Sequence, residues 1–399
     1  LGVNPLRSLW SNFVRMEGWV TIIHLWALYI VSTSMFGSGE EGKRAWHRFL
    51  NAELLVAVLV AGYGLFQIFG WAAIHQGSTR IDASLGNAAY MAVYMLINAG
   101  IASYMYFVAR AGKIANAGFL KWAYPILALV FSFEVFETAT RGTILGLAGA
   151  IMLACFLYAV LGKNEKKSSR IWAGGVIVLV IAVGGILYGA KNTAFVQNHD
   201  VLNRLASISI SDTQGQARAY VWPMALKGFT QRPILGGGQE NFNYIFNANY
   251  NPKMWNQEQW FDRAHSVFLD WLTSSGIVGL LVYLALYAFF LVAVWKSSLT
   301  LAEKSVLTGL LAGYAVHNVF VFDNLASYFL FFIGLGFANS LREGKEMGWM
   351  SRFSLSSEAV EYVATPVVII ALVATVYFFN VRAIEANSRL IDGLVACSG

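Results

Sequence analysis

The sequence predicts an all-α integral membrane protein with about ten transmembrane helices and one long extracytoplasmic loop. Its composition is the first reason, since 57% of the 399 residues are hydrophobic and only 13% are charged, whereas soluble domains carry about 25% charged residues. The second reason is that the apolar residues gather in stretches long enough to cross a bilayer. The third is a single polar stretch, about residues 190–264, that is much longer than any other connection.

Ten apolar stretches approach the roughly 20 residues that a transmembrane helix needs. We expect the run at 265–295 to begin above the membrane, because it is longer than a bilayer requires. In chain order the stretches cover residues 18–36, 50–74, 87–109, 122–138, 143–161, 171–189, 265–295, 305–321, 326–341 and 362–380.

The distribution of basic residues predicts the orientation, because short cytoplasmic loops favour Lys and Arg. Loop 162–170 contains four basic residues, and loops 37–48, 110–121 and 342–361 contain three each. These loops share one side if all ten spans alternate, and that side is therefore the cytoplasmic one. The opposite, outer side holds residues 1–17, 75–86, 139–142, 190–264, 322–325 and 381–399.

Four regions follow from this topology. Residues 1–189 form an N-terminal transmembrane bundle, residues 190–264 an extracytoplasmic loop, and residues 265–380 the C-terminal transmembrane helices. The tail at 381–399 has the pattern of a short amphipathic helix on the outer side. Because the chain opens with Leu and stops just after this tail, we expect an earlier span before it and a further domain after it.

One segment of the long loop, residues 222–231, is expected to form an interfacial helix. Pro223 stands near its start, and proline is tolerated in the first turn of a helix. Such a helix would shape a groove for a lipid chain. The alternative is a plain cover over the bundle.

Charge and cysteine content exclude several classes of protein. The formal net charge is +6, but the basic residues lie between apolar runs, which fits membrane topology better than nucleic-acid binding. Cys155 and Cys397 suggest neither a disulfide framework nor a metal cluster. The sequence has no Asp-x-Asp motif, no metal-ligand spacing and no phosphate-binding glycine loop. If the protein is an enzyme, we expect it to work without metal or nucleotide cofactor, on a substrate that carries its own leaving group.

Five charged or titratable residues on the outer side are candidates for that chemistry. Arginine forks bind phosphate oxygens in a bidentate manner, so arginines that converge at an interface suit a lipid pyrophosphate. A neutral histidine accepts a proton from a hydroxyl near neutral pH. Local salt bridges with Glu134, Glu137, Asp82 or Asp262 are the alternative for each arginine, and an interfacial histidine without a catalytic task is the alternative for the histidine. The five residues are Arg80, Arg141, Arg218, Arg263 and His265.

Other polar residues near the outer ends of the spans have simpler interpretations. Glu134 and Glu137 lie one helical turn apart, where they would orient Arg141 or line a cavity. His317, with Asp323 and the following Asn, is expected to form a polar cluster that packs helices together.

Several short motifs occur on the outer side in a characteristic order. Thr140-Arg141-Gly142-Thr143 comes first, then Arg218-Ala219-Tyr220-Val221-Trp222, then Pro233-Ile234-Leu235-Gly236-Gly237-Gly238. His265-Ser266-Val267-Phe268-Leu269 and Gly276-Ile277-Val278-Gly279-Leu280-Leu281 follow. Together with Arg80 and Gly86-Asn87, this set resembles the O-antigen ligase/O-antigen polymerase superfamily over roughly residues 75–340. The family commonly has His-Asn where this chain has His265-Ser266, which keeps the histidine but changes its neighbour.

The resemblance implies a membrane glycosyltransferase of lipopolysaccharide biosynthesis in the bacterial cell envelope. It would move a glycan from an undecaprenyl-pyrophosphate carrier to an acceptor hydroxyl, a lipid A-core sugar, at the periplasmic face of the inner membrane. Matched residue by residue, His265, Arg218 and Arg141 are implied to be catalytic. Our hypothesis is a metal-independent, inverting displacement with His265 as base and the arginines on the pyrophosphate. The expected substrate-binding residues are Arg80, Arg263, Trp222, Gly237 and Glu137.

Two alternatives remain open at this stage. Within the enzyme class, an O-antigen polymerase or a protein O-oligosaccharyltransferase uses the same donor with another acceptor. From another class, a transporter or flippase of a lipid-linked glycan would place charges near the middle of the membrane. Glu134, Glu137 and His317 keep that alternative open.

Overall fold

The computed structural model describes residues 2–11, 17–76, 79–114, 117–206, 217–255, 259–342 and 356–398. All regular secondary structure in these ranges is helical, so the prediction of an all-α membrane protein is confirmed. Seven helices in this part of the chain are long and apolar enough to cross a membrane. They are α2 (Trp19–Phe36), α3 (Gly39–Ile68), α4 (Ala88–Arg110), α6 (Arg141–Leu161), α7 (Lys167–Gly189), α12 (Val267–Lys296) and the stretch Ser357–Phe378.

The other three predicted spans are also helices, but they are shorter or more polar. They form α5 (Leu120–Glu137), α13 (Leu301–Phe320) and α14 (Leu325–Ser340). Helix α14 has only 16 residues, and α13 has a buried glutamate in its first turn and a buried histidine in its last. Each of the ten apolar stretches therefore overlaps a helix, although the stretch at 50–74 runs past the end of α3 at Ile68.

The expected basic loop at 37–48 is mostly helical, and that expectation was wrong. Gly37 adopts a left-handed conformation that ends α2, and α3 begins only two residues later. Glu40 and Glu41 in the first turn stabilise the start of α3, because acidic side chains interact favourably with the positive end of the helix dipole. The basic residues thus lie on a helix, which Lys and Arg favour intrinsically.

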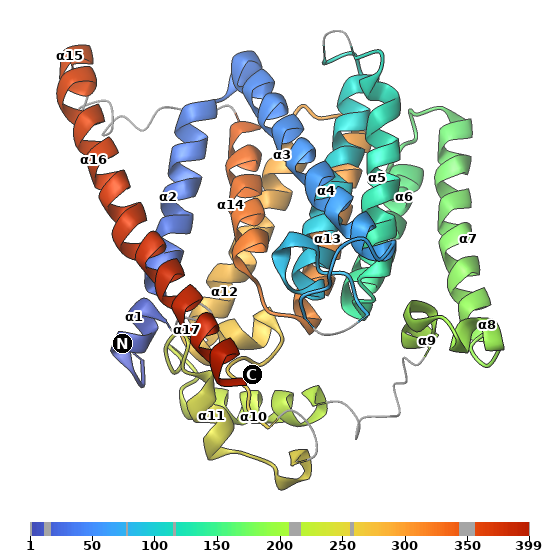
Figure 1. The fold of residues 1–399 in the computed structure, drawn as a ribbon. Coiled ribbons are helices and arrows are strands. Elements are labelled where there is room, and N and C mark those ends of the chain that lie inside the picture. Colours follow the sequence, from blue (N-terminus) through green and yellow to red (C-terminus); the bar gives the residue numbers. More distant parts are fainter. Residues whose placement is uncertain are drawn as a thin grey trace. The chain divides into compact units, whose positions relative to one another are not determined.

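Helices α6 and α13 pack closely against each other. The two helices meet at glycines, so that a Cβ atom on Gly313 would lie 2.8 Å from the carbonyl oxygen of Gly146. Small residues at such crossings let membrane helices approach closely. This contact brings the N-terminus of α6 beside the C-terminus of α13. Helix α4 lies between its neighbours in the middle of the bundle (Figure 1), and most of its side chains are buried.

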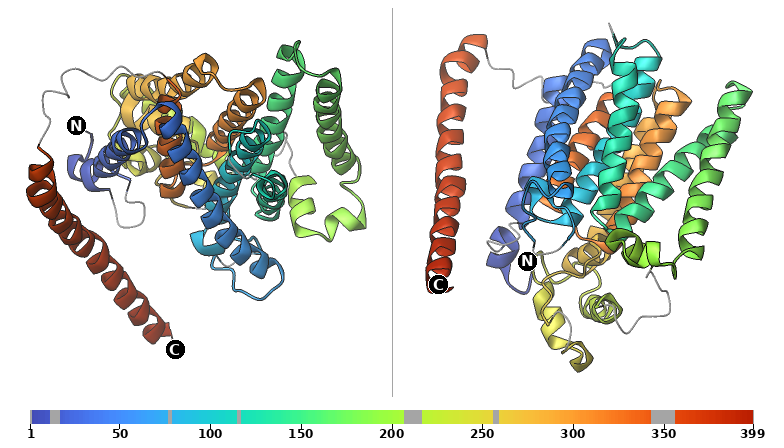
Figure 2. Two further views of the ribbon diagram at one scale, coloured as in Figure 1. Left: turned by 90° about the horizontal axis from the view of Figure 1, so that it is seen from above. Right: turned by 45° about the vertical axis from the view of Figure 1, so that its right-hand side comes forward.

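Helix α7 is packed very differently. It stands at the edge of the bundle beside α6 (Figure 1 and Figure 2), and none of its residues is buried. An apolar helix with no buried side chain is suited to contact with lipid. It leads into two short helices, α8 (Ala194–Gln197) and α9 (Asp200–Ala206).

The described residues 217–255 and 259–264 of this segment lie beyond one end of the bundle (Figure 1) and have an apolar core of their own. It contains α10 (Arg218–Gln231), α11 (Phe242–Ala248) and the 3-10 turn η2 (Pro252–Met254). The helix expected at 222–231 begins at Arg218, so Pro223 lies inside it and not near its start. The core residues are Val221, Met224, Ala225, Phe242, Phe246, Met254, Phe261 and Ala264.

Helix α12 is interrupted where the 190–264 segment packs against it. Gly276 has φ +64° and ψ −164°, and a Cβ atom there would lie 2.2 Å from the carbonyl oxygen of Ile234. Only glycine accommodates this combination. The backbone N–H of Gly237 donates to the carbonyl of Thr273 at 2.8 Å. The first turns of α12 are therefore joined to the segment that precedes them.

The N-terminal residues are tied to the same segment. Helix α1 (Pro5–Trp10) follows Val3, whose backbone N–H donates to the carbonyl of Gly237 at 2.8 Å. The Ser8 hydroxyl donates to the carbonyl of Gln239 at 3.0 Å. Residues far apart in the sequence thus form one layer at this end of the bundle.

Residues 344–399 form a second compact unit. Its described part is helical throughout, through α15 (Ser357–Ala359), η4 (Val360–Ala364), α16 (Thr365–Thr375), η5 (Val376–Val381) and α17 (Arg382–Ser398). The tail predicted to form a helix at 381–399 corresponds to α17.

Candidate active site

A cavity of about 360 Å³ lies at the end of the bundle where the 190–264 segment packs. Four separate connections contribute to its wall, and all four are predicted to lie on the outer side. We call this cavity the arginine pocket. It is lined by Gln76, Arg80, Asn87, Ala89, Tyr90, Ala139, Thr140, Arg141, Gly142, Leu145, Arg204, Arg218, His265, Phe320, Val321 and Phe322.

The charge of the arginine pocket is strongly positive. Four arginines line it, and the lining residues that the structure describes include no Asp or Glu. Burial, followed by the positive charges of Arg204 and Arg141, lowers the pKa of Arg80 to about 10. Guanidinium groups that lower each other's pKa gain free energy when an anion enters between them. The pocket is therefore suited to a ligand with more than one negative charge.

Arg80 is held by backbone and side-chain acceptors at the turn between α5 and α6. Its Nε donates to the carbonyl of Thr138 at 2.9 Å, and its Nη2 donates to the hydroxyl of Thr140 at 2.8 Å. The loop that carries Arg80 is organised by Asp82, which accepts hydrogen bonds from the Gln67 amide at 2.7 Å and the His75 backbone at 2.9 Å. Burial alone would raise the pKa of Asp82, but these hydrogen bonds hold it below its usual value.

Arg141 and Arg204 are linked through main-chain carbonyls. Arg141 is the first residue of α6, and its Nε donates to the carbonyl of Arg204 at 2.6 Å. The Nε of Arg204 in turn donates to the carbonyl of Ala139 at 3.1 Å. Ala139 has φ +49°, a conformation uncommon for a residue with a side chain. These contacts fix helix α9 against the α5–α6 turn and place both guanidinium groups at the pocket.

His265 lies two residues before the start of α12 at Val267 and shares this unusual backbone conformation, with φ +54°. Its Nδ1 lies 3.3 Å from the carbonyl oxygen of Arg263. Phe261 and Phe322 contact the imidazole ring edge to face, each with ring centroids 5.1 Å apart. When Nδ1 donates its proton to the carbonyl, Nε2 carries the lone pair, and that tautomer is the one a general base needs.

Two comparisons with known proteins point to the same family. A family model described as O-Antigen ligase matches residues 126–284. A protein of Pseudomonas aeruginosa described as "O-antigen ligase" is 24% identical over 247 residues. Both similarities support the O-antigen ligase superfamily as the family of this chain. The alignment covers 61% of this chain and 52% of the relative, so the chain spans about half the length of the curated protein that it matches.

Of the residues predicted for this O-antigen ligase relative, four come together in the arginine pocket. His265, Arg218, Arg141 and Arg80 line one cavity, although they lie in three different connections of the chain. Sequence reasoning overlooked Arg204, which lines the same cavity. The only sequence signal for it was that it is a further arginine in the long loop, and no motif surrounds it.

Arg263 lies outside the arginine pocket, in a buried ion-pair cluster. Its guanidinium contacts Glu240 and lies 2.6 Å from a carboxylate oxygen of Glu17. Although burial alone would lower the pKa of Arg263, the charges of these glutamates hold it above its usual value. This geometry fits an arginine that ties the N-terminal residues to the 190–264 segment.

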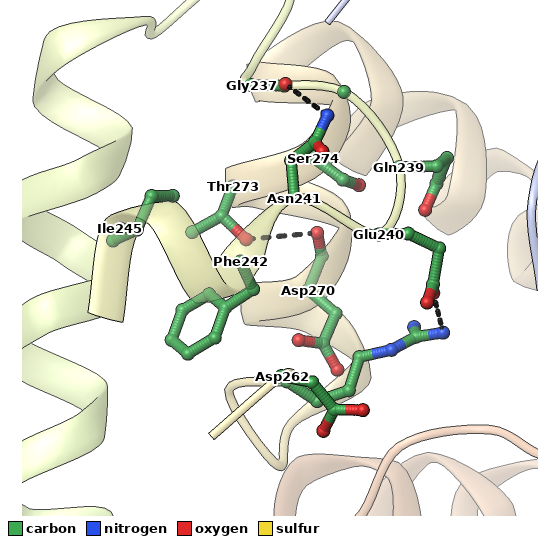
Figure 3. A pocket seen from close by; sticks show the side chains of 12 residues that line it. Gly237, Gln239, Glu240, Asn241, Phe242, Ile245, Asp262, Asp270, Thr273 and Ser274 are labelled. Atoms are coloured by element: carbon green, nitrogen blue, oxygen red, sulfur yellow. Dashed lines mark hydrogen bonds and ion pairs between the residues drawn. The ribbon is translucent and has the colours of Figure 1, made fainter. Parts of the chain in front are cut away.

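Three further predicted substrate-binding residues also lie elsewhere. Gly237 lines a small separate cavity (Figure 3), where its carbonyl accepts a hydrogen bond from the Asn241 amide at 3.0 Å. Trp222 donates from its indole Nε1 to the carbonyl of Ala264 at 3.1 Å. Glu137 is the last residue of α5 and is not among the residues that line the arginine pocket.

The polar residues predicted to pack helices make extensive hydrogen bonds. His317 lies 2.6 Å from the hydroxyl of Thr143 in α6, and both side chains are buried. Asp323 accepts hydrogen bonds from Tyr283 at 3.0 Å and Ser327 at 2.9 Å. Within the described ranges, no group of three or more His, Cys, Asp or Glu side chains is arranged to hold a metal ion.

Proposed function

We propose that this protein transfers a glycan from a polyprenyl-pyrophosphate carrier to an acceptor hydroxyl, and that the reaction takes place in the arginine pocket. One observation carries the proposal: four arginines and a histidine line a single cavity whose described wall includes no carboxylate. A pyrophosphate ester supplies the matching negative charge and leaves without further activation. We place the pocket on the periplasmic side of the bacterial inner membrane, as the charge distribution of the loops predicts.

In this mechanism the arginines bind the pyrophosphate and stabilise the charge that builds on it. Charge-assisted hydrogen bonds from guanidinium groups are shorter and stronger than neutral ones. Fixed donors aimed at developing charge lower the barrier most when they need no rearrangement during the reaction. The contacts from Arg141 to Arg204 and from Arg204 to Ala139 provide such fixation.

His265 acts as the general base. Its Nε2 takes the proton of the acceptor hydroxyl as the hydroxyl oxygen attacks the anomeric carbon. The bond from that carbon to the pyrophosphate oxygen breaks, and the electron pair leaves with the pyrophosphate. Attack from the side opposite the leaving group inverts the anomeric centre. General-base catalysis of this kind contributes about 10²–10⁴-fold to the rate.

An apolar groove supports a lipid-linked donor. It has a volume of about 410 Å³ and is lined by side chains of α4, α5, α6 and α13. Helix α6 contributes to both cavities, with Leu145 in the arginine pocket and Leu147 in the groove, on different faces of the helix. A polyprenyl chain placed in the groove would keep its apolar surface away from water.

The test is glycan transfer by purified protein in EDTA. The donor is an undecaprenyl-pyrophosphate oligosaccharide with a labelled glycan, offered with lipid A-core, without acceptor, or with a hydroxyl-containing peptide. Label that moves to lipid A-core supports the ligase reaction. Extension of the donor alone would indicate a polymerase, and label on the peptide a protein glycosyltransferase. Donor that binds, stays intact and crosses a vesicle membrane would contradict the proposal and indicate transport.

A further inference from the structure

We propose that Asp270 and Trp222 are positioning residues that hold the backbone before His265, and thereby aim its imidazole for proton transfer. The inference rests on the proposed function only for the role of His265. The contacts that carry it are independent of the substrate. Neither Asp270 nor Trp222 lines the arginine pocket, so each acts through the chain segment that carries the histidine.

The conformation of His265 requires such support. Its φ of +54° lies in the left-handed region, which residues with a side chain adopt in only a few per cent of cases. Backbone strain of this kind persists only where the surrounding structure fixes it, and it concentrates at functional sites. A histidine that directed its ring elsewhere could relax to an ordinary conformation.

Both backbone groups of the preceding residue, Ala264, are held by side chains. Its N–H donates to Oδ1 of Asp270 at 2.7 Å, and its carbonyl accepts from Nε1 of Trp222 at 3.1 Å. Ala264 is fully buried, so water does not replace a lost partner easily. On the other side of the histidine, the N–H of Val267 donates to the carbonyl of Val321 at 3.3 Å. The backbone is therefore anchored before and after His265.

The two positioning side chains come from different helices and are themselves fixed. Asp270 is in the first turn of α12, is 8% exposed, and donates its backbone N–H to the carbonyl of Ser266 at 2.8 Å. In Figure 3 its carboxylate points toward the chain at Asp262, at the start of the turn that leads to His265. Trp222 in α10 stacks on Phe320, a residue of the arginine pocket, with ring centroids 6.3 Å apart.

The chain offers matched variants for both residues. Asp270→Asn keeps an oxygen that accepts from Ala264, whereas Asp270→Ala removes it. Trp222→Phe keeps a ring against Phe320 but removes the indole donor. Because a displacement of about 1 Å at a reacting group costs on the order of 10²-fold, we expect Asp270→Ala to lower kcat by about 10²-fold and Trp222→Phe by about 10-fold. Asp270→Asn should retain most of the wild-type kcat.

A positioning role predicts two further results. The KM for the donor should stay unchanged in all three variants, because the arginines are untouched. In a His265→Ala background, Asp270→Ala should cause no additional loss, since residues that act as a unit are not additive. Equal loss in Asp270→Asn and Asp270→Ala, a rise in donor KM that parallels the fall in kcat, or full additivity would each overturn the proposal.

A spectroscopic measurement separates this proposal from the proposed function. Nitrogen NMR of histidine-labelled protein reports the tautomer of each imidazole, and the signal of His265 among the six histidines is assigned by its loss in His265→Ala. We expect Asp270→Ala, but not Asp270→Asn, to shift that signal. If this shift occurs although the wild-type protein shows no transfer, the proposed function is refuted and the positioning role stands. An unchanged signal in Asp270→Ala would refute the positioning role.

Discussion

Replacing Arg204 with alanine is expected to weaken binding of the donor pyrophosphate by about 10- to 100-fold. Arg204 lines the arginine pocket, and its charge contributes to the lowered pKa of Arg80. Hydrogen bonds to charged groups contribute about 1.5–3 kcal/mol. Since about 1.4 kcal/mol corresponds to a factor of ten, the loss of one guanidinium predicts that range. The carbonyl of Arg204 that accepts from Arg141 is main chain and remains in the variant, whereas the hydrogen bond from the Arg204 side chain to the carbonyl of Ala139 is lost.

The assay is competition of inorganic pyrophosphate and undecaprenyl pyrophosphate with labelled donor, together with kcat/KM for transfer. Arg232 provides the control, because Arg232→Ala makes the same change of charge at an exposed residue that does not line the pocket. Arg204→Lys should lie between wild type and Arg204→Ala, since lysine keeps the charge but not the fork. Equal effects of Arg204→Ala and Arg232→Ala would refute the reasoning, because net charge alone would then explain the loss.

Three further predictions follow from individual contacts. Binding of the glycan-linked pyrophosphate donor, a diester whose charge is constant in this range, should weaken as the pH rises through about 10, because burial lowers the pKa of Arg80 to about 10 and a deprotonated guanidine no longer attracts an anion. Titration calorimetry between pH 8 and 11 measures this, and constant affinity would contradict it. Arg263→Gln should lower the unfolding free energy by about 3–5 kcal/mol, since it leaves two glutamates buried without their partner, and an unchanged melting temperature would contradict that role. Gly276→Ala should lower the melting temperature markedly, because its φ is +64° and its Cβ would clash with main chain, whereas Gly184→Ala, with open space around it, should not.

The helices were predictable from the sequence because a transmembrane helix is marked by a continuous stretch of apolar residues. Apolar length alone located ten stretches, and each overlaps a helix of the structure. The error at 37–48 has the same origin, since a run of charged residues was interpreted as a loop although Lys, Arg and Glu all favour helices. The interruption of α12 at Gly276 depends on contact with Ile234, and nothing in the local pattern reports such a contact.

The candidate site was predictable in part. The order of motifs and the alternation of spans indicated that Arg80, Arg141, Arg218 and His265 share one side, and the structure places them around one cavity. Arg204 was overlooked because its contact with Ala139 joins residues 65 positions apart and no motif marks it. Distant contacts of this kind depend on how the helices pack, which local sequence does not encode.

Two residues predicted to bind substrate, Arg263 and Trp222, make other contacts in the structure. Arg263 was chosen as an arginine on the predicted outer side, yet its side chain pairs with Glu17 and Glu240 while its carbonyl faces the histidine. Trp222 belongs to the same motif as Arg218, but its indole reaches Ala264. Both predictions therefore identified residues close to His265. Which contact each side chain makes depends on how the helices and loops pack together.

The most direct test of His265 as the base compares donor binding with turnover in His265→Ala. We expect this variant to bind the undecaprenyl-pyrophosphate glycan with the affinity of the wild type, because the four arginines remain in place, while single-turnover transfer falls by at least about 10²-fold. Transfer at the wild-type rate would contradict the assignment of His265 as the base.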